Sequence, residues 1–363
     1  MTPSNVHQGI AALNPYKPGK PVEELARELG LDDIIKLASN ENPRGPSPSV
    51  AAAVQAACGE LTRYPDGSGY LLKTALAQHI GVDAAQITLG NGSNDVLDLV
   101  ARVTVEPGSQ VVTAQHSFVV YRLATVSAGG ELIEVPAKDY GADLGAMLDA
   151  VGPKTRTVFI ANPNNPTGTW LASTPLKQFL QSVPENVWVV VDEAYFEYVA
   201  DPEYPNCTQW LAEFPNLIVT RTFSKAYGLA AVRLGYAVSS STMADLMNRA
   251  RQPFNCSSLA LAAGVAALED QGYVQESVAL NNAGMQQLLA GFAQLGLASI
   301  PSLGNFVCVD CGRPGAQVFE AMLQKGVIVR PVAEYGLPDH VRISVGLEAE
   351  NARCLEALTA VLA

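Results

Sequence analysis

The residues best suited to chemistry lie between Thr220 and Arg233, in the sequence TRTFSKAYGLAAVR. Lys225 stands there between small hydroxyl residues and a glycine, soon after a short apolar run. A lysine amine in this setting could form a Schiff base with a carbonyl compound. Thr222, Ser224 and Arg233 could bind an anion beside it. Because most lysines are solvated surface charges, the prediction depends on what other segments supply.

Two further polar segments follow apolar runs upstream of Lys225. Residues 187–191 (VWVVV) indicate a buried strand that ends in Asp192, and Tyr195 comes three residues later. Asn165 lies in the proline-flanked turn 161–168 (ANPNNPTG), after another apolar run. An acid, a phenol, an amide, a lysine and an arginine at the ends of successive strands are the groups needed to bind and use pyridoxal phosphate.

Each of these residues suits one part of that cofactor. The ring nitrogen needs a carboxylate, and Asp192 suits it; the alternative is a turn or helix-capping acid. Tyr195 could reach the same ring from the same loop. Asn165 has its direction fixed by the flanking prolines, although alone it would be interpreted as an ordinary turn asparagine.

A glycine-containing turn supplies a candidate phosphate site. Residues 90–95 (GNGSND) follow a short strand pattern and open a helix, so their N–H groups could bind phosphate at the positive helix end. The spacing is not GxGxxG, because Asp95 takes the third glycine position, and a tight turn with a capping side chain is the alternative. Phe118 opens the next helix after a strand and could stack on the cofactor ring or be a core aromatic.

The elements that position these residues alternate along the chain. We predict helices near 70–80, 118–127, 143–151 and 174–183, a helix from 90–95 to about 105, and strands near 86–89, 111–114, 132–135, 156–161, 187–191, 217–221 and 234–239. This alternation predicts an α/β fold, with a mostly parallel sheet sandwiched by helices. Ligands in such sheets bind beyond the carboxyl ends of the strands, where the polar segments fall.

The pattern changes after about residue 251. We predict helices near 257–272, 273–296, 315–325 and from Glu348, strands near 305–310, 327–330 and 341–345, and an N-terminal helix at 22–29. These elements are typical of a smaller α+β domain. The length of 363 residues also favours about two domains.

Composition excludes several classes of protein. The formal net charge is −12 and no Lys/Arg-rich block is present, which argues against nucleic-acid binding. Any anionic substrate must therefore be bound by local cationic groups. The segment 1–19 lacks an apolar leader and no run of about 18 apolar residues occurs, so we expect a cytoplasmic protein that binds no membrane.

No metal site is expected. Cys308 and Cys311 form a lone CxxC inside a strand pattern, without the second pair or the nearby histidines that zinc requires. The six cysteines are expected to be reduced and incidental, and the four histidines are dispersed.

The chain resembles the fold-type I pyridoxal-phosphate aminotransferases of class I/II, and within them it is most similar to the histidinol-phosphate aminotransferases. The resemblance covers nearly the whole chain. It is carried by NPYKPGKP (14–21), LASNENP (37–43), RYPD (63–66), NPNNPTG (162–168), DEAY (192–195), TFSKA (222–226), VIVRP (327–331) and VRISVG (341–346). This combination is highly specific for the aminotransferases and less specific for the substrate.

The resemblance implies a role for each matching residue of the cofactor site. Lys225 would be the Schiff-base lysine and would carry the proton between substrate carbon and cofactor. Asp192 would pair with the pyridinium, and Tyr195 and Asn165 would contact the ring oxygen. The phosphate would be bound by Thr222, Ser224, Arg233 and the backbone of Ser93 and Asn94, and Phe118 would take the ring-stacking position.

The resemblance also implies substrate residues and an assembly. Arg342 would bind the carboxylate of glutamate or 2-oxoglutarate, while Arg330 and Tyr16 would bind the substrate phosphate or the donor side chain. Asn40 is a further predicted substrate residue. Tyr64 would reach the cofactor phosphate of a neighbouring subunit, which implies a homodimer with active sites at the interface. Residues 36–250 would form the large domain, and 1–35 with 251–363 the arm and the small domain.

The activity implied by the resemblance is transamination of L-histidinol phosphate with 2-oxoglutarate, giving imidazole-acetol phosphate and glutamate in histidine biosynthesis. One alternative is an aromatic amino acid aminotransferase, since a flat ring fits either pocket. A second is a pyridoxal-phosphate decarboxylase of an amino-acid phosphate such as threonine phosphate.

Two more distant alternatives are less compatible with the sequence. A regulatory module that binds the cofactor lacks the spare length for a DNA-binding part, and a nicotinamide dehydrogenase lacks its third glycine. Two residues also depart from expectation. Arg44 stands where this family is expected to have an apolar residue, and Glu334 follows the predicted substrate residue Arg330, with a surface position favoured.

Overall fold

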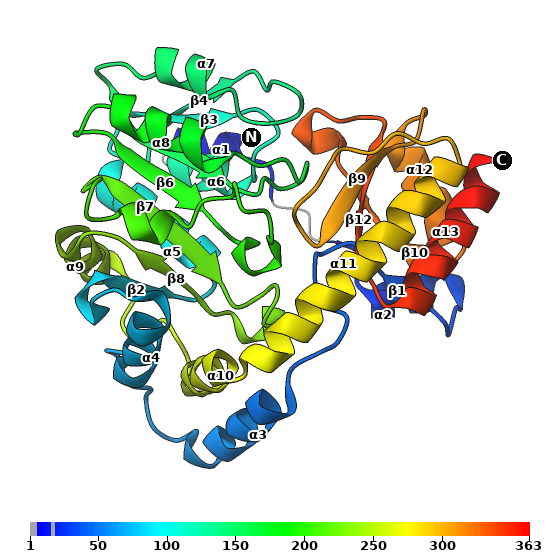
Figure 1. Cartoon of the computed structure of the whole chain (residues 1–363), viewed down its shortest axis with the longest axis horizontal. Coiled ribbons are helices and arrows are strands. Elements are labelled where there is room, and N and C mark those ends of the chain that lie inside the picture. The colour runs from blue at the N-terminus through cyan, green and yellow to red at the C-terminus, as the bar shows by residue number, and fades with distance from the viewer. Residues whose placement is uncertain (1–5, 16–18) are drawn as a thin grey trace.

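The computed structural model describes residues 6–15 and 19–363 and arranges them around one large and two small β-sheets (Figure 1). The helices are α1 (Gln8–Ala12), α2 (Val22–Leu29), α3 (Pro48–Ala57), α4 (Tyr70–Ile80), α5 (Ser93–Thr104), α6 (Val120–Ser127), α7 (Leu144–Asp149), α8 (Ser173–Ser182), α9 (Ser241–Ala250), α10 (Ser258–Glu269), α11 (Gln271–Gln294), α12 (Gly315–Leu323) and α13 (Glu348–Leu362). The strands are β1 (Ile35–Lys36), β2 (Ile87–Gly90), β3 (Gln110–Ala114), β4 (Glu131–Val135), β5 (Thr155–Ala161), β6 (Trp188–Asp192), β7 (Leu217–Thr222), β8 (Gly235–Val238), β9 (Phe306–Asp310), β10 (Val327–Ile328), β11 (Arg330–Pro331) and β12 (His340–Ser344).

The large sheet has seven strands in the order β2-β8-β7-β6-β5-β3-β4. All neighbours pair in parallel except β8, which runs antiparallel to both β2 and β7. The chain turns back between β7 and β8 without the crossover helix that a parallel connection needs. The predicted mostly parallel α/β sheet is therefore confirmed, with one reversed strand.

Side chains that alternate along the central strands fill two cores on opposite faces of this sheet. In β6, Val189 and Val191 belong to one core and Val190 to the other. Helices α3, α4, α8 and α10 contribute to the first core, and α5, α6 and α9 to the second. Both faces are thus buried, which explains why these strands are continuous apolar runs rather than alternating patterns.

The smaller sheets lie at the other end of the molecule, beside the long helix α11 (Figure 1). Strands β11, β12 and β9 pair antiparallel, and the N-terminal strand β1 pairs in parallel with β10. Buried side chains of α11, α12 and α13 pack with those of β9 and β12 in a separate core. Residues from the start of the chain therefore complete a unit built largely from its end.

The structure differs from the predicted elements in a few places. Helices α1, α3 and α9 were not predicted. Helices α3 and α9 each begin after a serine that accepts a hydrogen bond from the first turn, Ser47 from Val50 N and Ser240 from Met243 N. Helix α6 begins at Val120, so Phe118 precedes this helix rather than opening it. Within the described residues, no helix combines the length and apolarity needed to cross a bilayer.

Candidate active site

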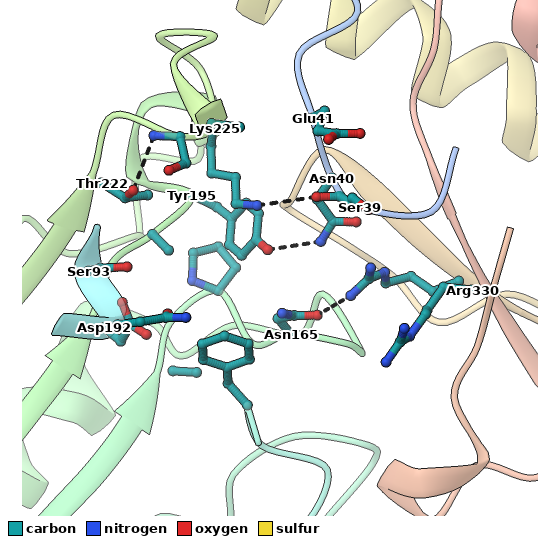
Figure 2. A pocket seen from close by; sticks show the side chains of 18 of the residues that line it. Ser39, Asn40, Glu41, Ser93, Asn165, Asp192, Tyr195, Thr222, Lys225 and Arg330 are labelled. Atoms are coloured by element: carbon teal, nitrogen blue, oxygen red, sulfur yellow. Dashed lines mark hydrogen bonds between the residues drawn. The ribbon is translucent and has the colours of Figure 1, made fainter. Parts of the chain in front are cut away.

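A cavity of about 270 Å³ lies where the carboxyl ends of β5, β6 and β7 face the small antiparallel sheet (Figure 2). The structure brings nearly all of the predicted site residues to its wall. These are Asn40, Ser93, Asn94, Phe118, Asn165, Asp192, Tyr195, Thr222, Ser224, Lys225, Arg233, Arg330 and Arg342. Segments far apart in the sequence thus meet at one site, as the strand-end prediction requires.

The carboxylate at the end of β6 is buried and held by two hydroxyl groups. Thr220 Oγ1 donates to Asp192 Oδ1 at 2.9 Å, and Tyr121 Oη donates to Asp192 Oδ2 at 2.9 Å. Burial raises the pKa of Asp192 to about 6, and the two hydrogen bonds oppose that rise. A carboxylate in this state gains from a cationic N–H partner in the cavity.

Lys225 lies in the loop after β7, and its amine points into the cavity toward Ser39 and Asn40 (Figure 2). Lys225 Nζ donates to the carbonyl oxygen of Ser39 at 3.4 Å and lies 5.7 Å from the ring centroid of Tyr195. Burial, followed by the nearby charge of Arg342, lowers the pKa of Lys225 to about 8. The lowered pKa increases the fraction of the amine that is neutral, and hence nucleophilic, near neutral pH.

The phenol of Tyr195 is oriented from both sides. Asn40 Nδ2 donates to Tyr195 Oη at 2.9 Å, and the Tyr195 ring packs edge-on against Phe306 at 5.1 Å. Asn40 is itself fixed, because its backbone N–H donates to Ser344 Oγ at 2.8 Å and Asn305 Nδ2 donates to its carbonyl oxygen at 3.0 Å. Asn40 adopts a φ of 53°, so this loop conformation is held by its surroundings.

An anion cradle lies at the start of α5. The N-cap residue Gly92 has a φ of 80° and offers no side chain to the first-turn N–H groups, which leaves them available to an anion. A Cβ on Gly92 would lie 2.3 Å from Arg233 Nη2, and one on Gly235 would lie 2.3 Å from Ser93 N. Arg233 Nη1 approaches Ser224 Oγ at 3.4 Å. Backbone N–H groups, a hydroxyl and a guanidinium thus converge, as phosphate binding requires.

Two guanidinium groups approach the cavity from the small sheet. Arg330 and Arg342 face each other across β11 and β12. Arg342 Nη1 donates to Asn165 Oδ1 at 2.6 Å and its Nη2 to the carbonyl oxygen of Ala38 at 2.6 Å. Arg330 Nη2 donates to Glu334 Oε1 at 2.5 Å. The site therefore presents cationic groups to an anionic substrate although the protein as a whole is acidic.

Among the predicted site residues that the structure describes, Tyr64 does not line this cavity. Tyr64 is 83% exposed and its ring stacks on Phe254 at a centroid distance of 4.7 Å. Tyr16 lies outside the described residues. Arg44 also lies away from the cavity, where it pairs with Glu276. Its position explains why a charged residue is tolerated there.

Several residues that complete the site were not predicted. Thr220 faces Asp192 across the β6–β7 register, and Tyr121 reaches Asp192 from α6. Ser344 and Asn305, which fix Asn40, come from the end of the chain. The roles of these four residues depend on strand register and on tertiary contacts, which the local sequence pattern does not predict.

The cysteines play no part in the cavity. All six are unpaired, and within the described residues no group of His, Cys, Asp or Glu could hold a metal ion. Cys308 Sγ donates to the carbonyl oxygen of Pro166, and burial raises the pKa of Cys308 to about 12 and that of Cys311 to about 11. The raised pKa keeps both groups protonated near neutral pH, and neither lines the cavity.

Comparisons with known proteins find relatives that match nearly the whole chain. Residues 32–358 match the family described as aminotransferase class I and II. The chain is 58% identical over 357 residues to histidinol-phosphate aminotransferase 2 of Pseudomonas fluorescens, covering 98% of this chain and 96% of that protein. It is 54% identical over 364 residues to the histidinol-phosphate aminotransferase of Methylobacillus flagellatus, covering 100% and 97%. The crystal structure of histidinol-phosphate aminotransferase from Sinorhizobium meliloti in complex with pyridoxal-5'-phosphate superimposes with a TM-score of 0.91 at 35% identity, covering 99% and 98%.

Proposed function

The chain belongs to the class I and II aminotransferases, and on this premise we propose that it transfers the amino group of L-histidinol phosphate to 2-oxoglutarate, with pyridoxal phosphate as its cofactor. The products are imidazole-acetol phosphate and glutamate, a step of histidine biosynthesis. The observation that carries this conclusion is the convergence of Asp192, Lys225 and Arg233 on one cavity, in a chain similar to histidinol-phosphate aminotransferases over nearly its whole length.

The cavity fits pyridoxal phosphate in three independent ways. Asp192 is a buried carboxyl group with a raised pKa, and a protonated ring nitrogen would stabilise its ionised form. Lys225 offers an amine of lowered pKa to the aldehyde. The cradle between Gly92 and Arg233 would leave too little room for a Cβ but leaves N–H groups for a phosphate. Bound there, the cofactor would act as an electron sink that stabilises negative charge on the substrate's reacting carbon.

The chain's own residues supply the proton transfers and the orientation. Lys225 holds a proton near neutral pH and can release it again, as a group that moves a proton to and from the reacting carbon must. Asp192, held by Thr220 and Tyr121, would keep a proton on the ring nitrogen of the bound cofactor. Tyr195, oriented by Asn40, and Asn165 are placed to direct hydrogen bonds to the ring oxygen.

Arg342 and Arg330 bind the anionic groups of the two substrates. Arg342 already donates to Asn165 and Ala38, so its guanidinium is oriented before a substrate arrives, and this lowers the entropy cost of binding. We assign to Arg342 the group next to the reacting carbon, which is the carboxylate of glutamate or the phosphate-bearing arm of the donor.

We also propose a homodimer in which Tyr64 serves the active site of the second subunit. Its exposed ring, supported by Phe254, is surrounded in the sequence by the exposed side chains of Leu61, Tyr70 and Leu71, which a second copy would bury. Mixing inactive Lys225→Ala chains with inactive Tyr64→Ala chains tests this, because a mixed dimer regains one complete site. No recovery of activity after subunit exchange would contradict shared sites.

We propose a cytoplasmic location, where six unpaired thiols stay reduced. We propose a division into a large domain of residues 36–250 and a unit formed by residues 1–35 and 251–363. Helix α10 packs on α3 and α4 through the larger core, so limited proteolysis should show whether cleavage occurs near residue 250 or beyond α10.

Half-reaction spectra test the function directly. The purified holoenzyme is mixed separately with L-histidinol phosphate, phenylalanine and glutamate, and the absorbance change that accompanies amino transfer is followed. We expect conversion with L-histidinol phosphate and glutamate, and much slower conversion with phenylalanine. Fastest conversion with phenylalanine would favour the aromatic aminotransferase. Release of carbon dioxide without a keto product from an amino-acid phosphate would favour the decarboxylase.

A further inference from the structure

A charged pair lies where two cavities adjoin. The active-site cavity is lined by Arg330, and a second cavity of about 690 Å³ is lined by Glu334. Phe118, Tyr121 and Tyr335 line both cavities, so the two spaces share a wall. The ion pair between Arg330 Nη2 and Glu334 Oε1, at 2.5 Å, therefore connects the cofactor side to the larger space beside it.

Glu334 is held in place by the turn that carries it, the 3₁₀ helix η6 (Ala333–Tyr335). Val332 before the turn is fully buried, and Tyr335 is 9% exposed in the same small core. The turn ends at Gly336, which has a φ of 79°, and a Cβ added there would lie 3.3 Å from His116 Cε1. The buried residues on both sides thus fix the backbone position of Glu334. The Glu334 side chain is 41% exposed, and that of Arg330 is 9% exposed.

The proposed function sets a recognition problem for this region. One site must accept two substrates whose far ends have opposite character. L-histidinol phosphate ends in an imidazole, which donates a hydrogen bond through N–H and is partly cationic near neutral pH. Glutamate ends in a carboxylate, which only accepts hydrogen bonds. The cavity that would hold both substrates is lined by Arg330, and the cavity beside it is lined by Glu334.

We propose that Glu334 is a specificity-determining residue that selects the imidazole end of the donor, an inference that rests on the proposed function. Glu334 accepts a hydrogen bond from the imidazole N–H while it remains beside Arg330. The side-chain carboxylate of glutamate or 2-oxoglutarate instead binds Arg330 and displaces Glu334. The pair therefore offers the Glu334 carboxylate as an acceptor to the imidazole and the Arg330 guanidinium as a donor to the side-chain carboxylate.

This arrangement makes Glu334 act on the two substrates in opposite directions. For the imidazole it supplies an attractive charged acceptor. For the side-chain carboxylate it is a competitor, because the incoming anion must replace Glu334 at Arg330 and then lies near a like charge. Removing the charge of Glu334 should weaken the first interaction and strengthen the second, a pattern that general loss of structure cannot produce.

The test is the variant Glu334→Gln, which keeps the size of the side chain and removes its charge. We expect kcat/KM for the half-reaction with L-histidinol phosphate to fall about tenfold, as the loss of a hydrogen bond to a charged group implies, and kcat/KM for glutamate to rise about threefold. Glu334→Asp keeps the charge and should keep the wild-type order of the two substrates. Glu276→Gln removes a carboxylate paired with Arg44 away from the cavity and should change neither value.

Equilibrium binding supplies a readout independent of turnover. Titration calorimetry of the holoenzyme would use glutarate and an imidazolylpropyl phosphate that lacks the amino group. In Glu334→Gln, glutarate should bind more tightly and the imidazole compound more weakly. Shifts in the same direction, or no shift in either, would overturn the role of Glu334. A wild-type enzyme that gives no half-reaction with L-histidinol phosphate would overturn the proposed function itself, and this inference with it.

Discussion

Tyr121 donates a hydrogen bond of 2.9 Å to Oδ2 of Asp192, from a fully buried ring that stacks on Phe159 at a centroid distance of 4.8 Å. The phenol keeps its proton, because burial and the neighbouring carboxylate raise the pKa of Tyr121 well above its ordinary value. This contact connects helix α6 to the end of β6. It also lowers the pKa of Asp192 and so opposes the effect of burial, which raises it. The charge of the carboxylate thus depends on a residue outside every motif in the sequence.

Replacing this phenol should shift the pH dependence of the enzyme. Tyr121→Phe removes a hydrogen bond that favours the ionised form, so the pKa of Asp192 should rise further above about 6. We expect kcat/KM to fall about tenfold at pH 6, and less at pH 8, where the carboxylate still ionises. Rates measured from pH 5 to 9 check this. Tyr198→Phe removes a buried phenol that does not line the cavity and serves as the control; an equal loss at all pH values would contradict the explanation.

Asp192→Asn should stabilise the cofactor-free protein while abolishing transamination. The pKa of Asp192 is about 6 in the folded state and near 3.8 when unfolded, so the folded state binds the proton more tightly. Stability therefore falls as the pH rises from about 4 to about 6, and the loss persists above that range. Removing the charge should recover about 1–2 kcal/mol at pH 7.5 and nothing at pH 3.5. Thermal unfolding at both pH values measures the difference, and an equal gain at both would show another cause.

Capture of the cofactor should follow the ionisation of Lys225. Only the neutral amine attacks an aldehyde, so the rate at which the cofactor-free protein takes up pyridoxal phosphate should rise with pH and level off above about 8. Arg342 lowers the pKa of Lys225, so Arg342→Gln should move this midpoint upward, whereas Arg342→Lys keeps the charge and should move it less. Stopped-flow absorbance gives the rates. A midpoint unchanged in Arg342→Gln would contradict the electrostatic role.

The anion cradle can be tested by adding one methyl group. Gly92→Ala places a Cβ where the structure leaves 2.3 Å to Arg233 Nη2, and should weaken pyridoxal phosphate binding at least about tenfold. Part of any effect is the strain of an alanine at a φ of 80°. Gly81→Ala is the matched control, because Gly81 has a φ of 82° but no atom within 4 Å of an added Cβ. Equal weakening in both variants would show that strain, not the cradle, is responsible.

The strand-end logic of parallel sheets accounts for what the sequence could predict. Asp192 and Lys225 each follow a strongly apolar run, and such runs become neighbouring strands whose carboxyl ends share an edge. The positions of Arg330 and Arg342 came only from the family resemblance, because their antiparallel pairing lies in the smaller sheet. Apolar periodicity and punctuation by glycine and proline were enough for most helices and strands.

Tyr121 and Glu334 show what the sequence could not predict. Tyr121 has the spacing of a core aromatic, and only the packing of α6 against the sheet brings its hydroxyl to a carboxylate. Glu334 was expected at the surface, and its side chain is partly exposed, but its pairing with Arg330 depends on the turn η6. Such contacts are set by tertiary packing, which local patterns do not encode.

The reversed strand β8 restricts the length of the loop that precedes it. Thr222 and Gly235 are paired in the ladder, so the loop that carries Lys225 and Arg233 is closed at both ends by fixed register. An insertion or deletion inside this loop would move the Lys225 amine relative to the Arg233 guanidinium. The number of residues between Lys225 and Arg233 should therefore vary far less among homologues than the lengths of the exposed loops.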